Sequence, residues 1–125
     1  MNAFILVFLG GGIGSVLRLA VYRLAGALLP AQFPYGTLIV NVAGGVAVGA
    51  LAGWFTARGT VSSATSLLLL TGLLGGFTTF SAFSLEAVTL WQRGAQSAAA
   101  LYVLASLSLS IAATIAGLAA VRAMG

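Results

Sequence analysis

The sequence predicts an all-α membrane protein with four transmembrane helices per chain, the third of them broken in mid-membrane. First, 61% of the 125 residues are hydrophobic and only 5% are charged, whereas about 25% of residues in a soluble domain are charged. Second, a membrane-spanning helix needs about 20 apolar residues, so four spans with short loops use the whole length as a single domain, residues 1–125. Third, glycine and β-branched residues interrupt the third apolar stretch, and both weaken a helix.

The composition also excludes several classes of function. The chain has one acidic residue, Glu86, five arginines and no Cys or His, which excludes ordinary transition-metal sites and histidine-based acid–base catalysis. We therefore predict that the protein is not an enzyme. The arginines are scattered singly toward the predicted span ends, where they can reach lipid headgroups. Because they form no basic patch, we expect the lipid bilayer, and no nucleic acid, as a partner.

The first span is predicted at about residues 3–24. Gly10 and Gly14 are small residues four apart, a spacing that favours close packing of two helices. The glycine run superficially suggests a dinucleotide-binding loop, but no strand precedes it and no acidic residue follows it. Arg18 lies in the last third of the span, where it either reaches the lipid headgroups or faces an aqueous vestibule and attracts anions.

The second span, at about residues 36–56, follows a linker with both prolines, which disfavour helix at the residue before them. Small or polar residues recur every four positions on one face of this span, at 37, 41, 45, 49 and 53. Asn41 interrupts the apolar run on that face, where an amide is costly unless it has partners. It either makes an interhelical hydrogen bond or turns its NH₂ group toward a bound anion.

The third span, at about residues 62–91, is too long for one membrane-spanning helix, since 30 residues would extend about 45 Å across a core of about 30 Å. We predict a break near Gly75 to Thr79, with the helix resuming at about Phe80. Such a break at membrane depth is tolerated where it is buried or lines a wet cavity, and it often holds ions. The alternative is a glycine kink with lipid-facing phenylalanines. Glu86 belongs either to an interfacial polar network or to a pore mouth.

The fourth span is predicted at about residues 95–122. One face of this apolar helix has a hydroxyl group every four residues, at Tyr102, Ser106, Ser110 and Thr114. Serine and threonine hydroxyls in a helix often bond back to the carbonyl four residues earlier. The alternative is a hydroxyl track that replaces the water around an ion.

The arginines give almost no preference for one orientation in the membrane. Four spans place both termini on the side of Arg58 and Arg122, opposite Arg93 and the near-end residues Arg18 and Arg23. A clear excess of Lys and Arg normally sets the orientation. We therefore predict that the chain inserts both ways and forms an antiparallel, dual-topology homodimer about a twofold axis in the membrane plane.

Three motifs resemble those of the Fluc (CrcB) family of small fluoride channels: GGGIGSVLR at 10–18, YGTLIVNVAGG at 35–45 and GLLGGFTTFSAFS at 72–84. They occur in the family's order and cover three of the four spans. Ala82 stands where a threonine is common in the family, so that hydroxyl is missing. The resemblance implies a fluoride-selective channel with two pores per antiparallel dimer. It would sit in a cell inner membrane or plasma membrane and let fluoride leave the cytoplasm passively, which reduces its toxicity.

The resemblance also implies roles for individual residues. Phe80 and Phe83 look like an aromatic box whose ring edges face fluoride, and Asn41 looks like an amide donor beside it. The backbone carbonyls of Gly75 and Thr78 look like the ligands of a structural sodium ion at the dimer axis. The vestibule and polar path would include the remaining predicted site residues: Arg18, Ser81, Tyr102, Ser106, Ser110 and Thr114.

Two other classes of protein have a comparable size and composition. A small multidrug transporter also has four spans, but it needs a carboxylate near the middle of the membrane to exchange protons. The first span has no acidic residue, and Glu86 lies late in the third span. A non-conducting subunit that only packs helices would be consistent with the 17 glycines.

Overall fold

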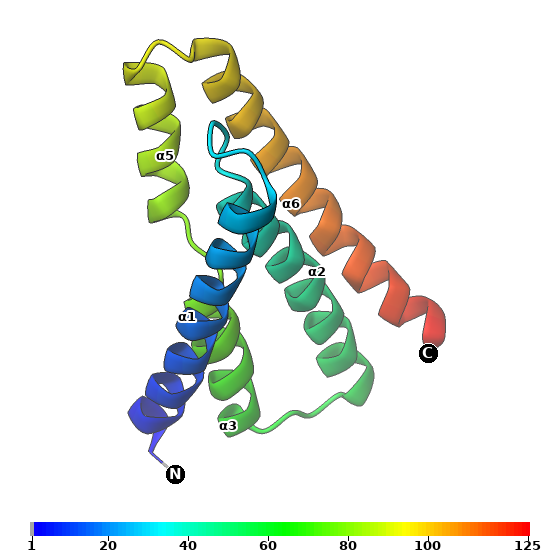
Figure 1. Cartoon of the computed structure of the whole chain (residues 1–125). Coiled ribbons are helices and arrows are strands. Elements are labelled where there is room, and N and C mark those ends of the chain that lie inside the picture. Colours follow the sequence, from blue (N-terminus) through cyan, green and yellow to red (C-terminus); the bar gives the residue numbers. More distant parts are fainter. Residues whose placement is uncertain (1) are drawn as a thin grey trace.

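The computed structural model describes residues 2–125, and its regular elements are all helical. Four apolar helical spans are long enough to cross a membrane, which confirms a multi-pass membrane protein: Ala3–Leu28, Tyr35–Arg58, Ser63–Gln92 and Gln96–Met124. Their bounds agree with the predicted spans to within a few residues. Both termini lie at the same end of the molecule, as an even number of spans requires (Figure 1).

Capping residues set the ends of the spans. Helix α1, Ala3–Leu28, begins after Asn2, whose side-chain oxygen accepts a hydrogen bond from the Phe4 N–H at 2.7 Å. Helix α2, Tyr35–Arg58, ends at Gly59, which has a φ of 76°. Gly94, before the last helix, has a φ of 86°. Glycine adopts this left-handed conformation without the steric cost that other residues meet, so it permits both sharp turns.

The third span is broken, as predicted. It consists of α3, Ser63–Ser66, the π-helix η1, Leu67–Leu74, α4, Gly75–Phe77, and α5, Ser81–Gln92. Between α4 and α5 the backbone of Thr78 is extended, with a ψ of 160°, and Figure 1 shows α5 set apart from α3 across this segment. The break therefore occupies residues 78–80, at the end of the predicted stretch. Gly75 and Gly76 are helical, which corrects that part of the prediction.

Close packing against α1 explains why the glycine pair stays helical. A methyl group on Gly76 would collide with the carbonyl oxygen of Gly11, and one on Gly14 would collide with the carbonyl oxygen of Leu73. The predicted close approach at Gly10 and Gly14 is thus confirmed, and its partner is the first half of the third span. These glycines bring two backbones together, as small residues do in membrane helices.

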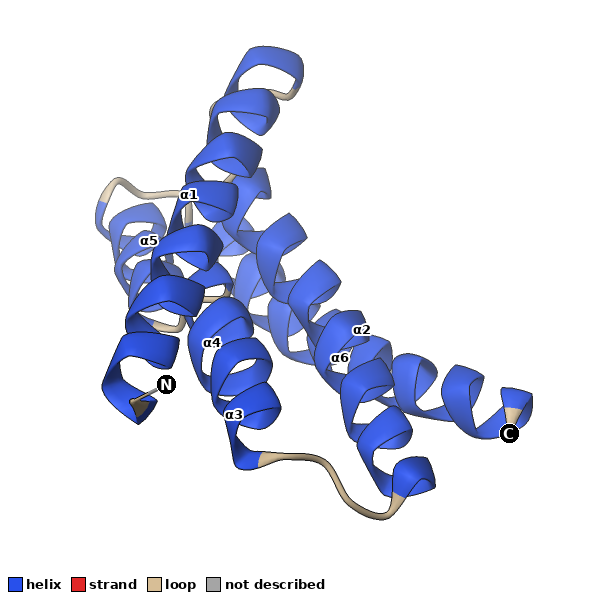
Figure 2. Cartoon of the chain, turned by 90° about the horizontal axis from the view of Figure 1, so that it is seen from below, coloured by secondary structure: helices blue, strands red, loops and turns tan. Residues whose placement is uncertain are grey.

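The second glycine face joins α2 to α6, Gln96–Met124, and the two helices lie side by side in Figure 2. Gly45 lies against the Ser110 carbonyl oxygen, and Gly49 against that of Thr114. From the other side, Gly117 of α6 lies against the Val46 carbonyl oxygen. The face of the second span on which small or polar residues recur every four positions is therefore the contact surface for the fourth span.

We predict that Gly49→Ala lowers the free energy of unfolding by about 1–3 kcal/mol, a typical cost of overpacking. The added methyl would collide with the Thr114 carbonyl, and neither helix backbone can yield without separating. Gly26→Ala is the matched control, because no atom lies near its added methyl, and it should stabilise the helix by about 0.5–1 kcal/mol. Denaturation in detergent micelles would measure both, and equal stability of the two variants would contradict this packing.

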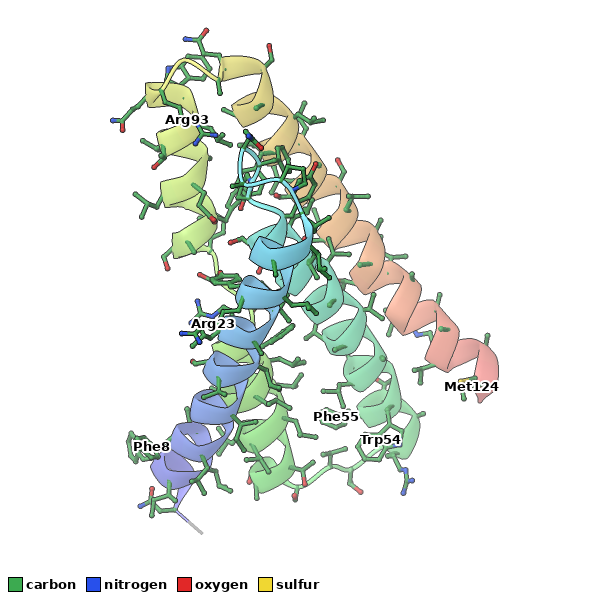
Figure 3. The ribbon with its side chains drawn as sticks, in the orientation of Figure 1. Phe8, Arg23, Trp54, Phe55, Arg93 and Met124 are labelled. Carbon is green, nitrogen blue, oxygen red and sulfur yellow. The ribbon has the colours of Figure 1, made fainter. Side chains whose placement is uncertain are left out.

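Large apolar side chains cover the outer surface, as expected for helices that face lipid (Figure 3). Phe8 of α1, for example, is 78% exposed in the single chain. At the end of α2 the guanidinium group of Arg58 lies 5.1 Å from the centre of the Trp54 ring. Tryptophan and arginine are both favoured at the lipid–water boundary, and a cation over an indole ring adds a further attraction.

Candidate functional site

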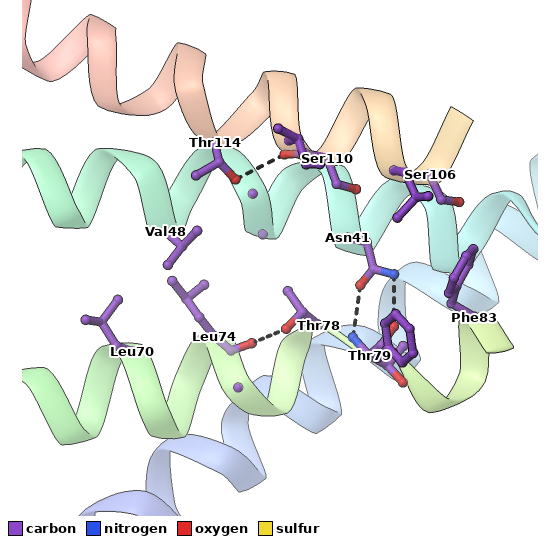
Figure 4. Close-up of a pocket in the computed structure, with 16 residues that line it drawn as sticks. Asn41, Val48, Leu70, Leu74, Thr78, Thr79, Phe83, Ser106, Ser110 and Thr114 are labelled. Atoms are coloured by element: carbon purple, nitrogen blue, oxygen red, sulfur yellow. Dashed lines mark hydrogen bonds between the residues drawn. The ribbon is translucent and has the colours of Figure 1, made fainter. Parts of the chain in front are cut away.

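A cavity of about 400 Å³ lies beside the break, between α2, the third span and α6 (Figure 4). Its lining includes eight of the predicted site residues: Asn41, Gly75, Thr78, Phe80, Phe83, Ser106, Ser110 and Thr114. Sequence positions far apart in the chain thus meet in one groove. Within the part of the chain that the structure describes, no charged residue lines it. The groove therefore offers neutral donors, carbonyl groups and aromatic rings.

Asn41 joins α2 to the broken segment by two hydrogen bonds (Figure 4). Its Nδ2 donates to the Thr79 carbonyl oxygen at 2.9 Å, and its Oδ1 accepts from the Thr79 N–H at 2.9 Å. The interhelical hydrogen bond considered for this residue is therefore present. An asparagine amide has two N–H groups, so these contacts leave the second one for another acceptor. Donation to an anion from that second N–H stays a prediction.

Two threonines satisfy the backbone at the ends of the break. The Thr78 hydroxyl donates to the Leu74 carbonyl at 2.9 Å, and the Thr79 hydroxyl oxygen accepts from the Ala82 N–H at 3.1 Å. The second contact is that of an N-cap residue, and it starts α5. Thr79 is not among the predicted site residues. The available signal was a threonine just before a resumed helix, which is a typical start pattern.

Two carbonyl groups beside the groove lose the donors that a continuous helix would give them. In such a helix the Thr79 N–H would donate to the Gly75 carbonyl, and the Ala82 N–H to the Thr78 carbonyl. Both N–H groups instead bond to side chains, Asn41 and Thr79 respectively. Carbonyl oxygens suit a hard cation, so the donor chemistry fits the sodium ion that the family resemblance implies. The role of Gly75 and Thr78 as sodium ligands stays a prediction.

Phe80 and Phe83 lie next to each other at one end of the groove. Their ring centres are 5.5 Å apart, and their planes are inclined by 58°. Phe83 is 8% exposed and is packed against the Tyr102 ring at 5.2 Å. Phe80, by contrast, is 74% exposed in the single chain. One ring is thus fixed in the core, and the other projects outward from the protomer.

The hydroxyl groups of α6 differ in their hydrogen-bond partners. The Thr114 hydroxyl donates to the Ser110 carbonyl four residues earlier, at 3.0 Å, which is the local bonding considered for this helix. The Ser106 side chain is 6% exposed, and within residues 2–125 its hydroxyl has no hydrogen-bond partner. Leaving such a group unpaired costs about 1–3 kcal/mol. Ser106 lines the groove, although its hydroxyl oxygen is itself buried in the single chain.

Three predicted site residues lie outside this groove. Tyr102 is fully buried, and its hydroxyl donates to Glu86 Oε1 at 3.2 Å. Ser81 is exposed, with its hydroxyl oxygen 3.4 Å from that of Thr79. Arg18 is partly buried on α1 and does not line the groove. The predicted track of hydroxyls therefore divides, because Tyr102 turns toward α5 while the other three residues line the groove.

Glu86 lies beside a second, smaller cavity of about 240 Å³ under the α1–α2 linker. Besides the Tyr102 contact, this region holds a hydrogen bond from the Thr37 hydroxyl to the Tyr22 hydroxyl oxygen at 3.1 Å. That pair could not be predicted from the sequence, because its two residues lie on different helices. The polar-network interpretation of Glu86 is thus supported, and a part in a pore mouth remains an expectation.

Comparison with known proteins identifies the family of the chain. The chain matches the family described as "CrcB-like protein, Camphor Resistance (CrcB)" over residues 5–118. It is similar to three proteins named "Fluoride-specific ion channel FluC". The protein from Rhodopseudomonas palustris (strain BisB5) is 50% identical over 121 residues, which cover 97% of this chain and 98% of that protein.

The second protein, from Methylobacterium nodulans, is 54% identical over 121 residues, which cover 97% of each chain. The third protein, from Rhizobium etli (strain CIAT 652), is 52% identical over 119 residues, which cover 95% of each chain. All three are named as ion channels, in agreement with the prediction that the chain is not an enzyme. The family match covers most of the sequence, and relatives that are about half identical align along nearly its full length. The chain therefore belongs to the CrcB family.

Proposed function

We propose that this protein is a fluoride-selective channel that lets fluoride leave the cytoplasm passively and so reduces its toxicity. The observation that supports this most is the uncharged groove beside the break, where Asn41, Ser106 and the two phenylalanines meet. The choice of fluoride as the ion follows from the names of the relatives, which are about half identical to this chain and are called fluoride-specific ion channels.

Neutral groups in the groove suit the passage of a small anion. The edge of an aromatic ring is positive, so Phe80 and Phe83 can hold fluoride without a full countercharge. The second N–H of Asn41 is a donor that can replace lost water. A channel must bind an ion strongly enough to admit it and weakly enough to release it. An arginine in this lining would bind fluoride too tightly for rapid release.

The functional unit is an antiparallel, dual-topology homodimer with two pores. One protomer leaves Phe80 74% exposed and Gly75 open at the edge of its groove. An inverted second copy would cover these residues and complete each groove, and a twofold axis repeats the arrangement. The near balance of arginines between the two ends allows both orientations in one membrane.

The Gly75 and Thr78 carbonyls of both copies would hold a structural sodium ion at the dimer axis. A bound sodium ion supplies positive charge that offsets the facing carbonyl dipoles of the two chains. This role depends on carbonyls that have lost their helical donors, as both have here.

Because hydrogen fluoride is a weak acid, fluoride accumulates in the cytoplasm, and the channel conducts it outward. Neutral hydrogen fluoride crosses a bilayer and ionises in a near-neutral cytoplasm, where fluoride becomes trapped. A passive pore lets the anion leave, driven by the inside-negative potential of a plasma membrane or cell inner membrane. One elementary charge crossing 100 mV gains about 2.3 kcal/mol, so the membrane potential is sufficient without an energy source.

Ion efflux from liposomes that contain the purified protein tests the proposal. We expect rapid fluoride efflux and little chloride efflux when a potassium ionophore dissipates the charge. Fluoride efflux would also exclude a non-conducting subunit. Equal efflux of both anions would contradict fluoride selectivity, and drug-dependent proton movement would favour the multidrug transporter instead.

A further inference from the structure

Asn41 touches the peptide group that holds one of the two proposed sodium ligands, the Thr78 carbonyl. The Thr79 N–H and the Thr78 carbonyl belong to the same peptide unit, which is planar and trans. In such a unit the N–H and C=O bonds point in opposite directions. Because Asn41 Oδ1 holds this N–H toward α2 at 2.9 Å, the Thr78 carbonyl must point away from α2.

The same contact also frees the second carbonyl. In a continuous helix the Thr79 N–H would be the donor to Gly75, and Asn41 takes that donor. The hydrogen bond from Nδ2 to the Thr79 carbonyl, also 2.9 Å, fixes the next peptide unit and keeps the helix from closing. Asn41 therefore removes the helical donor of the Gly75 carbonyl and sets the direction of the Thr78 carbonyl.

We infer that Asn41 is a positioning residue for the cation site, in addition to lining the anion groove. This inference rests on the proposed function, since it takes Gly75 and Thr78 as the sodium ligands. Sodium affinity and fluoride passage are then linked through one amide, which holds the Thr79 peptide with two of its atoms and keeps an N–H for the anion. Losing Asn41 should impair the two ion sites for different reasons.

The test is a sodium titration of thermal unfolding on the purified dimer, without fluoride. N-methylglucamine replaces sodium at constant ionic strength. A ligand that binds only the folded state raises stability with its concentration, so the wild-type melting temperature should rise with sodium. Asn41→Ala should raise the half-saturating sodium concentration by about tenfold or more, which corresponds to about 1.4 kcal/mol.

A further variant separates positioning from anion binding. Phe83→Ile, which leaves the Asn41 contacts in place, should lose fluoride efflux and keep the wild-type sodium response. A wild-type sodium response in Asn41→Ala would overturn the inference.

Hydrogen–deuterium exchange on the wild type decides the question if Asn41→Ala does not assemble. The peptide that contains Thr79 should exchange more slowly in sodium than in N-methylglucamine, and unchanged exchange would overturn the inference. Liposome efflux separates this result from the proposed function. If the wild type conducts fluoride but its melting temperature does not change with sodium, the inference is refuted and the proposed channel function is not. A sodium response without fluoride efflux supports the positioning role and refutes the channel.

Discussion

Phe83→Ile should reduce fluoride efflux from liposomes by roughly tenfold or more while the dimer stays assembled. Isoleucine is apolar and fills much of the ring's volume, but it has no positive edge to attract an anion. The replacement leaves the core position of Phe83 against Tyr102 occupied, and repacking of this kind usually costs less than about 1.5 kcal/mol. Phe80→Ile should lower efflux in the same way, because its ring lines the same groove.

Phe8→Ile is the matched control for the aromatic groups. Phe8 lies on the outer surface of α1, 78% exposed and away from the groove, so its replacement should leave efflux at the wild-type rate. Gel filtration of all three variants would show whether they assemble. Full efflux in both Phe80→Ile and Phe83→Ile would remove the aromatic box from the mechanism.

The four spans were predictable because each depends only on the length and apolar composition of its own stretch of sequence. A membrane crossing requires about 20 apolar residues of helix, and Asn2 precedes the first span while Gly59 and Gly94 follow the second and third. The α1 and α2 glycine faces were also predictable, since a spacing of four puts residues on one side of a helix.

The position of the break depends on contacts that the sequence does not display. Glycine suits both a broken backbone and a close helix contact, so Gly75 and Gly76 fit either interpretation. The backbone of α1 decides between them, because Gly11 packs against Gly76. The π-helix at Leu67–Leu74 has no residue signature of its own, because its first four residues are leucines, as in an ordinary apolar helix.

The groove was predictable in its residue types and less so in its geometry. Polar residues on an apolar span had to find partners, which singled out Asn41 and the α6 hydroxyls. The partner of Asn41 is 38 residues away, and only the fold brings it there. Tyr102 shares the spacing of Ser106, yet its long ring reaches Glu86 on α5. A repeat of four gives the face of a helix and leaves open how far each side chain extends.

Removing arginines from one end of the bundle should abolish fluoride efflux when each variant is expressed alone. Arg58→Gln with Arg122→Gln leaves positive charge at the linker end, and Arg23→Gln with Arg93→Gln leaves an excess at the end with both termini. The end with more arginines stays in the cytoplasm, so each variant inserts in a single orientation. An antiparallel dimer needs both orientations, and neither population can form one by itself.

Co-expression of the two variants should restore efflux, because each supplies the orientation that the other lacks. This rescue is also the control for folding: Arg93→Gln removes a hydrogen bond to the Gln32 carbonyl, and only folded chains can complement each other. A tag at the C-terminus should be accessible from both sides of the membrane in the wild type and from one side in each variant. Full efflux from a variant whose tag is exposed on one side alone would mean that parallel chains conduct, and the two-pore antiparallel arrangement would then be wrong.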